Sequence, residues 1–139
     1  MDASITLNCS CYSNYLEELI ELFENIGWKL TSEEGYLPLG DKGDFDWVYD
    51  NISKEEMKNI IRQKQERNEL IGIYFIKINS KEGFSVLARE MSDICIHLEI
   101  NRKTYDGVYT DFEWYKENFI DFLEKCSALV SYQFEESED

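Results

Sequence analysis

Four aspartates between residues 41 and 50 come closest to a metal-binding pattern in this 139-residue chain. Carboxylate oxygens are the ligands that Mg²⁺ and Ca²⁺ prefer. The spacing differs from the calcium loop D-x-[DN]-x-[DN]-G-x₅-E, so we expect no dedicated metal site. A carboxylate-dependent, metal-binding hydrolase that uses this loop is the alternative function. The four residues are Asp41, Asp44, Asp46 and Asp50.

Nucleophilic and acid–base chemistry has few candidates in this sequence. His97 is the only histidine, so any general base or Cys–His pair must use it. The cysteines lack the paired C-x₂₋₄-C spacing of zinc sites, and no family signature surrounds them. Neither G-x-x-x-x-G-K-[ST] nor G-x-G-x-x-G occurs, which removes the usual phosphate-binding loops. We therefore expect no catalytic residue, no metal ligand and no cofactor, with Cys9, Cys11, Cys95 and Cys126 as reduced thiols.

Large aromatic side chains alternate with the carboxylates of the same loop. Phe45, Trp47 and Tyr49 lie between aspartates, and binding hot spots favour that mixture. Trp114, beside an acidic row on a predicted helix, could border the same surface. Phe45 and Trp47 could instead fold back over the core, because aromatic side chains bury large areas. The predicted partner-binding residues are Asp41, Asp44, Phe45, Asp46, Trp47, Tyr49, Asp50, Glu113, Trp114, Glu117 and Asp121.

The net charge is −15, from 29 acidic and 14 basic side chains. It argues against nucleic acid or an anionic membrane as a direct ligand and favours a basic partner. Residues 13–52 and 106–139 each hold ten acids and two bases, whereas residues 53–105 hold eight acids and ten bases. Acidic rows on the first and last predicted helices fit an anionic docking surface. A solvated face that only keeps the protein soluble is the competing interpretation.

Strands are predicted where β-branched and aromatic residues run together or alternate with polar ones. Residues 70–78 are almost continuously apolar, as in a central strand with both faces covered. In residues 94–100 the isoleucines face a core, while Cys95, His97 and Glu99 occupy the opposite face. If no helix covers that face, part of the binding surface lies there. The predicted strands are residues 5–11, 28–30, 70–78, 84–88, 94–100 and 128–134.

Three capping boxes predict three helices. The first helix ends at Gly27 and the second runs to about Asn68. Only Met57, Ile60 and Ile61 form the apolar side of the second helix, so it should lie at the periphery. The boxes are Asn14 with Glu17, Ser53 with Glu56, and Thr110 with Glu113.

The order of these elements predicts an α+β fold. We expect a two-layer sandwich with a largely antiparallel sheet of about five to six strands, two long helices packed on it and a third peripheral helix. Parallel pairs could occur where a helix separates two strands. Residues 1–134 should form one domain, followed by an acidic tail at 135–139. No leader pattern opens the chain and no run approaches 18 apolar residues, so we expect a cytoplasmic protein.

Five strings lie between residues 37 and 115: Leu37-Pro38-Leu39-Gly40-Asp41, Asp44-Phe45-Asp46-Trp47, Glu69-Leu70-Ile71-Gly72-Ile73, Ile100-Asn101-Arg102-Lys103 and Thr110-Asp111-Phe112-Glu113-Trp114-Tyr115. Together they resemble immunity proteins of bacterial polymorphic-toxin loci, which are small, acidic and cytoplasmic. The shared strings carry no catalytic motif. The resemblance implies a non-enzymatic inhibitor that binds and occludes a toxin domain, often a basic nuclease, inside the producing cell.

The expected function is therefore stoichiometric inhibition of a cognate protein toxin. The acidic helix faces and the aromatic-acidic loop would dock on a basic surface of the toxin and exclude its substrate. We expect no nucleic-acid or membrane partner. Besides the hydrolase, a self-associating adaptor whose exposed sheet face pairs with itself is an alternative.

Overall fold

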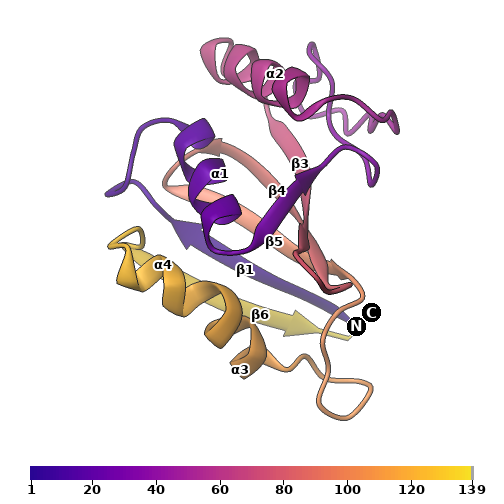
Figure 1. The fold of residues 1–139 in the computed structure, drawn as a ribbon, viewed down its shortest axis with the longest axis vertical. Coiled ribbons are helices and arrows are strands. Elements are labelled where there is room, and N and C mark those ends of the chain that lie inside the picture. The colour runs from indigo at the N-terminus through magenta and orange to yellow at the C-terminus, as the bar shows by residue number, and fades with distance from the viewer. Residues whose placement is uncertain (139) are drawn as a thin grey trace.

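The computed structural model describes residues 1–138, whose strands form one six-stranded sheet (Figure 1). All neighbouring strands are antiparallel, in the order β2-β3-β4-β5-β1-β6. This confirms the α+β fold with an antiparallel sheet, and no parallel pair occurs among the described strands. The strands are β1 (Asp2–Asn8), β2 (Trp28–Thr31), β3 (Ile71–Lys77), β4 (Gly83–Glu90), β5 (Asp93–Ile100) and β6 (Ser131–Ser137).

Alternation along the strands decides which sheet face carries the core. In β5, Ile94 and Ile96 are fully buried, whereas Cys95 between them is half-buried. The first and last helices pack apolar residues on the buried face, and the Phe23 and Phe119 rings meet edge-on with centroids 5.0 Å apart. The helices are α1 (Leu16–Asn25), α2 (Lys54–Glu66), α3 (Phe112–Tyr115), the π-helix η1 (Lys116–Ile120) and α4 (Asp121–Lys125).

The helices are shorter than the capping boxes suggested. α1 has 10 residues and α2 has 13. The last helix is continuous from Phe112 to Lys125 but takes π-helical geometry in its middle. The expected pair of long helices is therefore not confirmed. α2 contacts α1 and β3 and lies at one end of the molecule, in agreement with its narrow apolar side (Figure 1).

One of the three predicted capping boxes begins its helix as expected. Ser53 caps α2, since its Oγ accepts a hydrogen bond from the backbone N–H three residues later at 3.1 Å. The box at Asn14 is wrong, because α1 begins at Leu16 and its N-cap residue makes no side-chain bond. The box at Thr110 is wrong by one residue. There the Asp111 carboxylate accepts the N–H three residues later, also at 3.1 Å.

The C-terminal strand begins and ends later than the sequence suggested. β6 continues through Ser137, with Glu135 opposite Ser4 and Glu136 opposite Ala3 in β1. The strand therefore runs three residues beyond its predicted end at 134, and these acidic residues belong to an edge strand. Of the predicted tail, Asp139 lies outside the described residues.

The two faces of the sheet are covered differently. Figure 1 shows α1 and the α3–α4 helix on the core-bearing face. On the opposite face, Cys95 and His97 of β5 are half-buried and Glu99 is exposed. β3, predicted to be central, is second from the edge, and β4 and β5 occupy the centre.

Two acids of α1, Glu17 and Glu24, pair with bases of α2. Glu17 accepts two hydrogen bonds from Arg62, at 3.0 and 2.6 Å. Hydrogen bonding and the charge of Arg62 lower the pKa of Glu17. Glu24 pairs with Lys54 and with Lys58, the latter at 3.2 Å. The expected free anionic face of this helix is thus partly neutralised within the chain.

Candidate functional site

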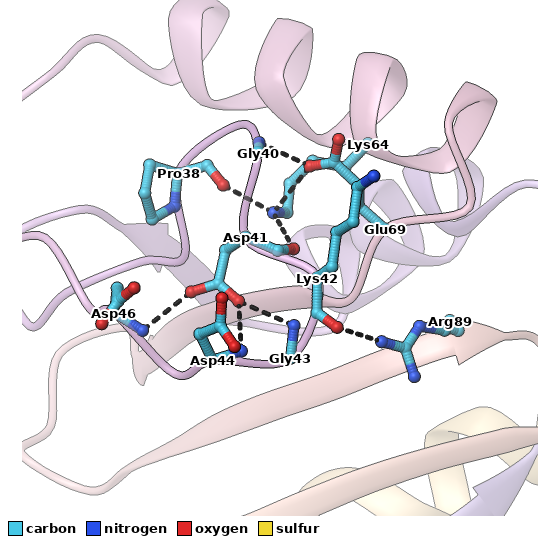
Figure 2. A network of polar contacts seen from close by, with 10 residues as sticks. All are labelled: Pro38, Gly40, Asp41, Lys42, Gly43, Asp44, Asp46, Lys64, Glu69 and Arg89. Carbon is cyan, nitrogen blue, oxygen red and sulfur yellow. Dashed lines mark hydrogen bonds and ion pairs between the residues drawn. The ribbon is translucent and has the colours of Figure 1, made fainter.

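A buried lysine holds the loop between β2 and α2, which contains the predicted aspartates. Lys64, on the inner side of α2, is 1% exposed. Its Nζ donates to the carbonyl oxygens of Pro38 at 2.7 Å and Asp41 at 3.4 Å, and lies 3.4 Å from Glu69 Oε1 (Figure 2). Burial lowers the pKa of Lys64 because it disfavours the charged ammonium. The loop carbonyls and the Glu69 carboxylate offset that cost by accepting from the ammonium.

Glu69 links the lysine to the loop backbone. Its Oε1 accepts a hydrogen bond from Gly40 N at 2.7 Å. Burial opposes ionisation, but this N–H and the Lys64 ammonium outweigh it and lower the pKa of Glu69. On the far side of the loop, Arg89 of β4 donates to the Lys42 carbonyl at 2.8 Å (Figure 2). The loop is therefore tied to both α2 and the sheet.

Asp41 organises the loop from within. Its Oδ1 accepts backbone N–H groups from Gly43 at 2.8 Å and Asp44 at 2.9 Å, and its Oδ2 accepts Asp46 N at 2.7 Å (Figure 2). Burial alone would raise the pKa of Asp41, yet these N–H groups prevail and lower it. Asp41 was predicted to contact a partner. Its side chain is instead buried and committed to the loop's own backbone.

Trp47 folds back over the sheet face opposite the core. Its ring lies against Tyr74 of β3, with centroids 5.3 Å apart. A Cβ added to Gly72 would lie 2.6 Å from Leu37 Cγ and 2.9 Å from Trp47 Cη2, so a glycine is needed for this approach. Leu37 N also donates to the Gly72 carbonyl at 3.0 Å. Trp47 therefore covers the sheet on the face opposite the core, and not the core itself as the alternative had it, and its ring is half-buried.

Five predicted contact residues face solvent on this anchored loop. Phe45 is 53% exposed and Tyr49 is 72% exposed. The backbone of Phe45 has φ 58°, in the left-handed region. We call these five residues the outer loop group: Asp44, Phe45, Asp46, Tyr49 and Asp50.

The remaining predicted contact residues lie on the last helix: Glu113, Trp114, Glu117 and Asp121. Figure 1 shows this helix at the end of the molecule away from α2, so the structure does not bring it together with the outer loop group. Trp114 is half-buried and packs edge-on to Trp28, with centroids 6.2 Å apart. Asp121 pairs with Lys116 at 3.1 Å. Only Glu113 and Glu117 of this set are exposed.

Sequence reasoning missed Lys64 and Glu69, which hold the loop. The available signal was the spacing of Lys64 from Ile61 and Met57, because residues three and seven positions apart share one helix face. All three are buried on the inner side of α2. A lysine in line with an apolar stripe was therefore a candidate for a buried charge.

Cys95 and His97 are near neighbours on β5. Cys95 Sγ lies 3.8 Å from His97 Nδ1. Burial, followed by the negative charges of Asp93 and Glu135, raises the pKa of the Cys95 thiol. A raised pKa disfavours the nucleophilic thiolate. Within residues 1–138, no group of three or more His, Cys, Asp or Glu side chains is placed to hold a metal ion.

Comparisons with protein-family models, with curated proteins and with solved structures gave no match to this chain. The fold and the loop geometry therefore carry the functional argument. In the part of the chain that the structure describes, no helix is both long enough and apolar enough to cross a membrane.

We expect Asp41 to make stability depend on pH in acid. Because folding lowers its pKa, the carboxylate stabilises the fold fully above its ordinary pKa of 3.8, and this contribution is lost as the pH falls through the lower folded value. Asp41→Asn should lose about 1–3 kcal/mol at neutral pH, since an amide cannot replace both acceptor oxygens.

Urea unfolding of both proteins at a series of pH values measures this difference. The gap between wild type and variant should narrow as the pH drops below 3.8. Asp50→Asn, at an exposed position of the same loop, is the matched control and should leave stability nearly unchanged. A gap that stays constant down to acid unfolding would contradict the assigned role.

Proposed function

We propose that this chain is a non-enzymatic inhibitor that binds one basic protein and covers its functional surface, as the immunity proteins of bacterial toxin loci do. One observation carries the proposal. The outer loop group presents two exposed aromatic rings and three exposed carboxylates on a loop anchored by Lys64, Asp41 and Trp47.

Anchoring matters because ordering a loop at the moment of binding reduces affinity. Here the loop is ordered within the free chain by the buried Lys64–Glu69 pair and by the bonds to Asp41. A buried ion pair is weak evidence for stability, since apolar residues could replace it without loss. Its use beneath an exposed loop supports a role in presenting that loop to a partner.

Charge supports a basic partner. Residues 33–50 contain six acids and one base. Of these acids only Asp41 is buried, so the surface around Phe45 and Tyr49 is negative. Complementary charge speeds encounter, while aromatic residues at the centre of an interface supply most of the affinity.

The hydrolase alternative has less support from the loop geometry. It requires the aspartates of residues 41–50 to converge on one cation with free oxygens. Both oxygens of Asp41 instead accept backbone N–H groups of the loop itself.

The test is coexpression with the protein encoded by the neighbouring gene. The wild-type chain should form a one-to-one complex with that protein and restore growth of cells that express it. Phe45→Ala and Tyr49→Ala should each raise the dissociation constant by roughly tenfold to a hundredfold, because both rings would be buried in the interface. Isothermal titration calorimetry measures the constants.

Phe122→Ala is the matched control, since Phe122 is 40% exposed on α4, away from the loop. It should bind as wild type does. The proposal fails if wild type forms no complex and rescues no growth. It also fails if Phe122→Ala weakens binding as much as the loop variants do.

A further inference from the structure

A second pre-formed surface loop lies between β5 and α3. Residues 104–110 form a hairpin whose terminal threonines are bridged as antiparallel neighbours. Tyr105 N donates to the Tyr109 carbonyl at 3.3 Å. Asp106 Oδ1 accepts the backbone N–H groups of Val108 at 2.9 Å and Tyr109 at 2.7 Å. The turn is thus closed by its own side chain as well as by its backbone.

Neighbouring side chains fix this hairpin to the sheet. Arg102 donates to Thr110 Oγ1 at 2.7 Å and to the Val108 carbonyl at 2.8 Å. Glu136 of β6 accepts Thr110 N at 2.8 Å and lies 3.6 Å from Arg102. Two charged groups therefore hold the base of the hairpin in place.

The apolar side chains of the hairpin remain in solvent. Tyr105 is 69% exposed, Val108 is 51% exposed and Tyr109 is 42% exposed. The two tyrosine rings stack on each other with centroids 6.4 Å apart and an interplanar angle of 20°. We call these three residues the aromatic tip. Large apolar groups grouped on a rigid projection are typical of protein contact sites.

Among the described residues, Asp106 is the unpaired charge beside the aromatic tip, since Arg102 and Glu136 offset each other as a pair 3.6 Å apart. Desolvation of the hydroxyl and the charges of Asp106 and Glu136 raise the pKa of Tyr105. Figure 1 shows the hairpin extending beyond the sheet next to α3, whereas the outer loop group lies toward α2 at the other end of the molecule. The tip is therefore a separate surface and can be altered without disturbing the loop.

We propose that the aromatic tip is a second contact with the basic partner, where Tyr105 and Tyr109 receive an arginine or lysine side chain of that protein. A cation over a tyrosine ring is attracted by the π electrons, and the nearby Asp106 carboxylate adds opposite charge. This inference rests on the proposed function. Two contacts on one rigid chain would reinforce each other, because engaging one raises the effective concentration of the other.

The test uses the neighbouring-gene protein as the binding probe. The double variant Tyr105→Ala/Tyr109→Ala should raise the dissociation constant of the complex at least about tenfold. Asp106→Asn keeps an acceptor oxygen for the two N–H groups but removes the charge, so it should weaken binding and reduce its salt dependence. Tyr105→Phe keeps the ring and should bind as wild type does. Tyr15→Ala, at a tyrosine 61% exposed elsewhere, is the control.

The outcomes separate the two proposals. If wild type binds, and both the double variant and Asp106→Asn bind as tightly as wild type, the aromatic tip is not a contact and the proposed function stands. Equal weakening by Tyr15→Ala also overturns the inference. If wild type forms no complex, both proposals fail. Thermal unfolding of each variant shows whether a loss of binding is a loss of fold. If the double variant has lost its fold, binding by the conservative Asp106→Asn decides whether the tip is a contact.

Discussion

Lys64→Met is expected to destabilise the chain by roughly 3 to 5 kcal/mol, the usual cost of removing one partner from a buried ion pair. The change leaves the Glu69 carboxylate, which is 4% exposed, with the Gly40 N–H as its remaining strong partner. It also leaves the Pro38 carbonyl without its donor at 2.7 Å. Urea unfolding at neutral pH measures the loss, and calorimetry should show weaker partner binding because the outer loop group is no longer anchored.

A second substitution distinguishes the cost of the unpaired Glu69 charge from the cost of lost packing. Glu69→Gln keeps an oxygen for the Gly40 N–H and removes the negative charge. The double variant Lys64→Met/Glu69→Gln should therefore recover part of the stability that Lys64→Met loses. Lys58→Met is the surface control and should cost less than about 1 kcal/mol, because its pair with Glu24 is partly exposed. No recovery, or an equal loss in the control, would contradict the assignment.

Trp28→Ala should cost roughly 3 to 5 kcal/mol by emptying the centre of the core. Trp28 is fully buried, and its ring centroid lies 4.7 Å from that of Phe84 and 5.9 Å from that of Phe119. Its Nε1–H donates to the Asn118 carbonyl in the π-helical segment at 3.0 Å. The residue therefore joins β2, the sheet and the last helix in one contact. Chemical denaturation followed by circular dichroism measures the change.

Two conservative variants test that account. Trp28→Phe fills most of the space but removes the indole donor, so it should cost about 1–3 kcal/mol, less than Trp28→Ala. Trp114→Phe alters a half-buried tryptophan in the same aromatic group and should cost less than Trp28→Ala. If Trp28→Ala unfolds no more easily than Trp114→Phe, the central role of Trp28 is wrong.

The frame of the sheet could be predicted because its signals are local. Alternation in residues 94–100 and the apolar run at 70–78 express burial directly, and both became strands. The strand order could not be predicted the same way. β1 lies between β5 and β6, so it pairs with segments roughly 90 and 130 residues away, and such distant pairing leaves no short-range pattern.

The candidate site was predictable in composition but not in arrangement. Asp41 and Asp44 are both loop aspartates, and nothing in the adjacent sequence shows that one is buried and the other exposed. Lys64, 23 residues from Asp41, helps to determine which aspartate is buried, because it donates to the loop carbonyls from α2. The paired acids of α1 were misjudged for the same reason, since their bases come from α2. In each case contacts between distant segments determine whether the side chain is buried, exposed or paired.

The left-handed backbone of Phe45 reduces the stability of the free protein. A phenylalanine in the left-handed region, at φ 58°, costs of order 1–3 kcal/mol, which glycine would avoid. The free protein bears that cost while the ring gains little from burial, being 53% exposed. A sequence optimised for folding alone would place glycine or asparagine there. Under the proposed function, this strained residue is a trade-off that favours the complex with the partner over the free protein.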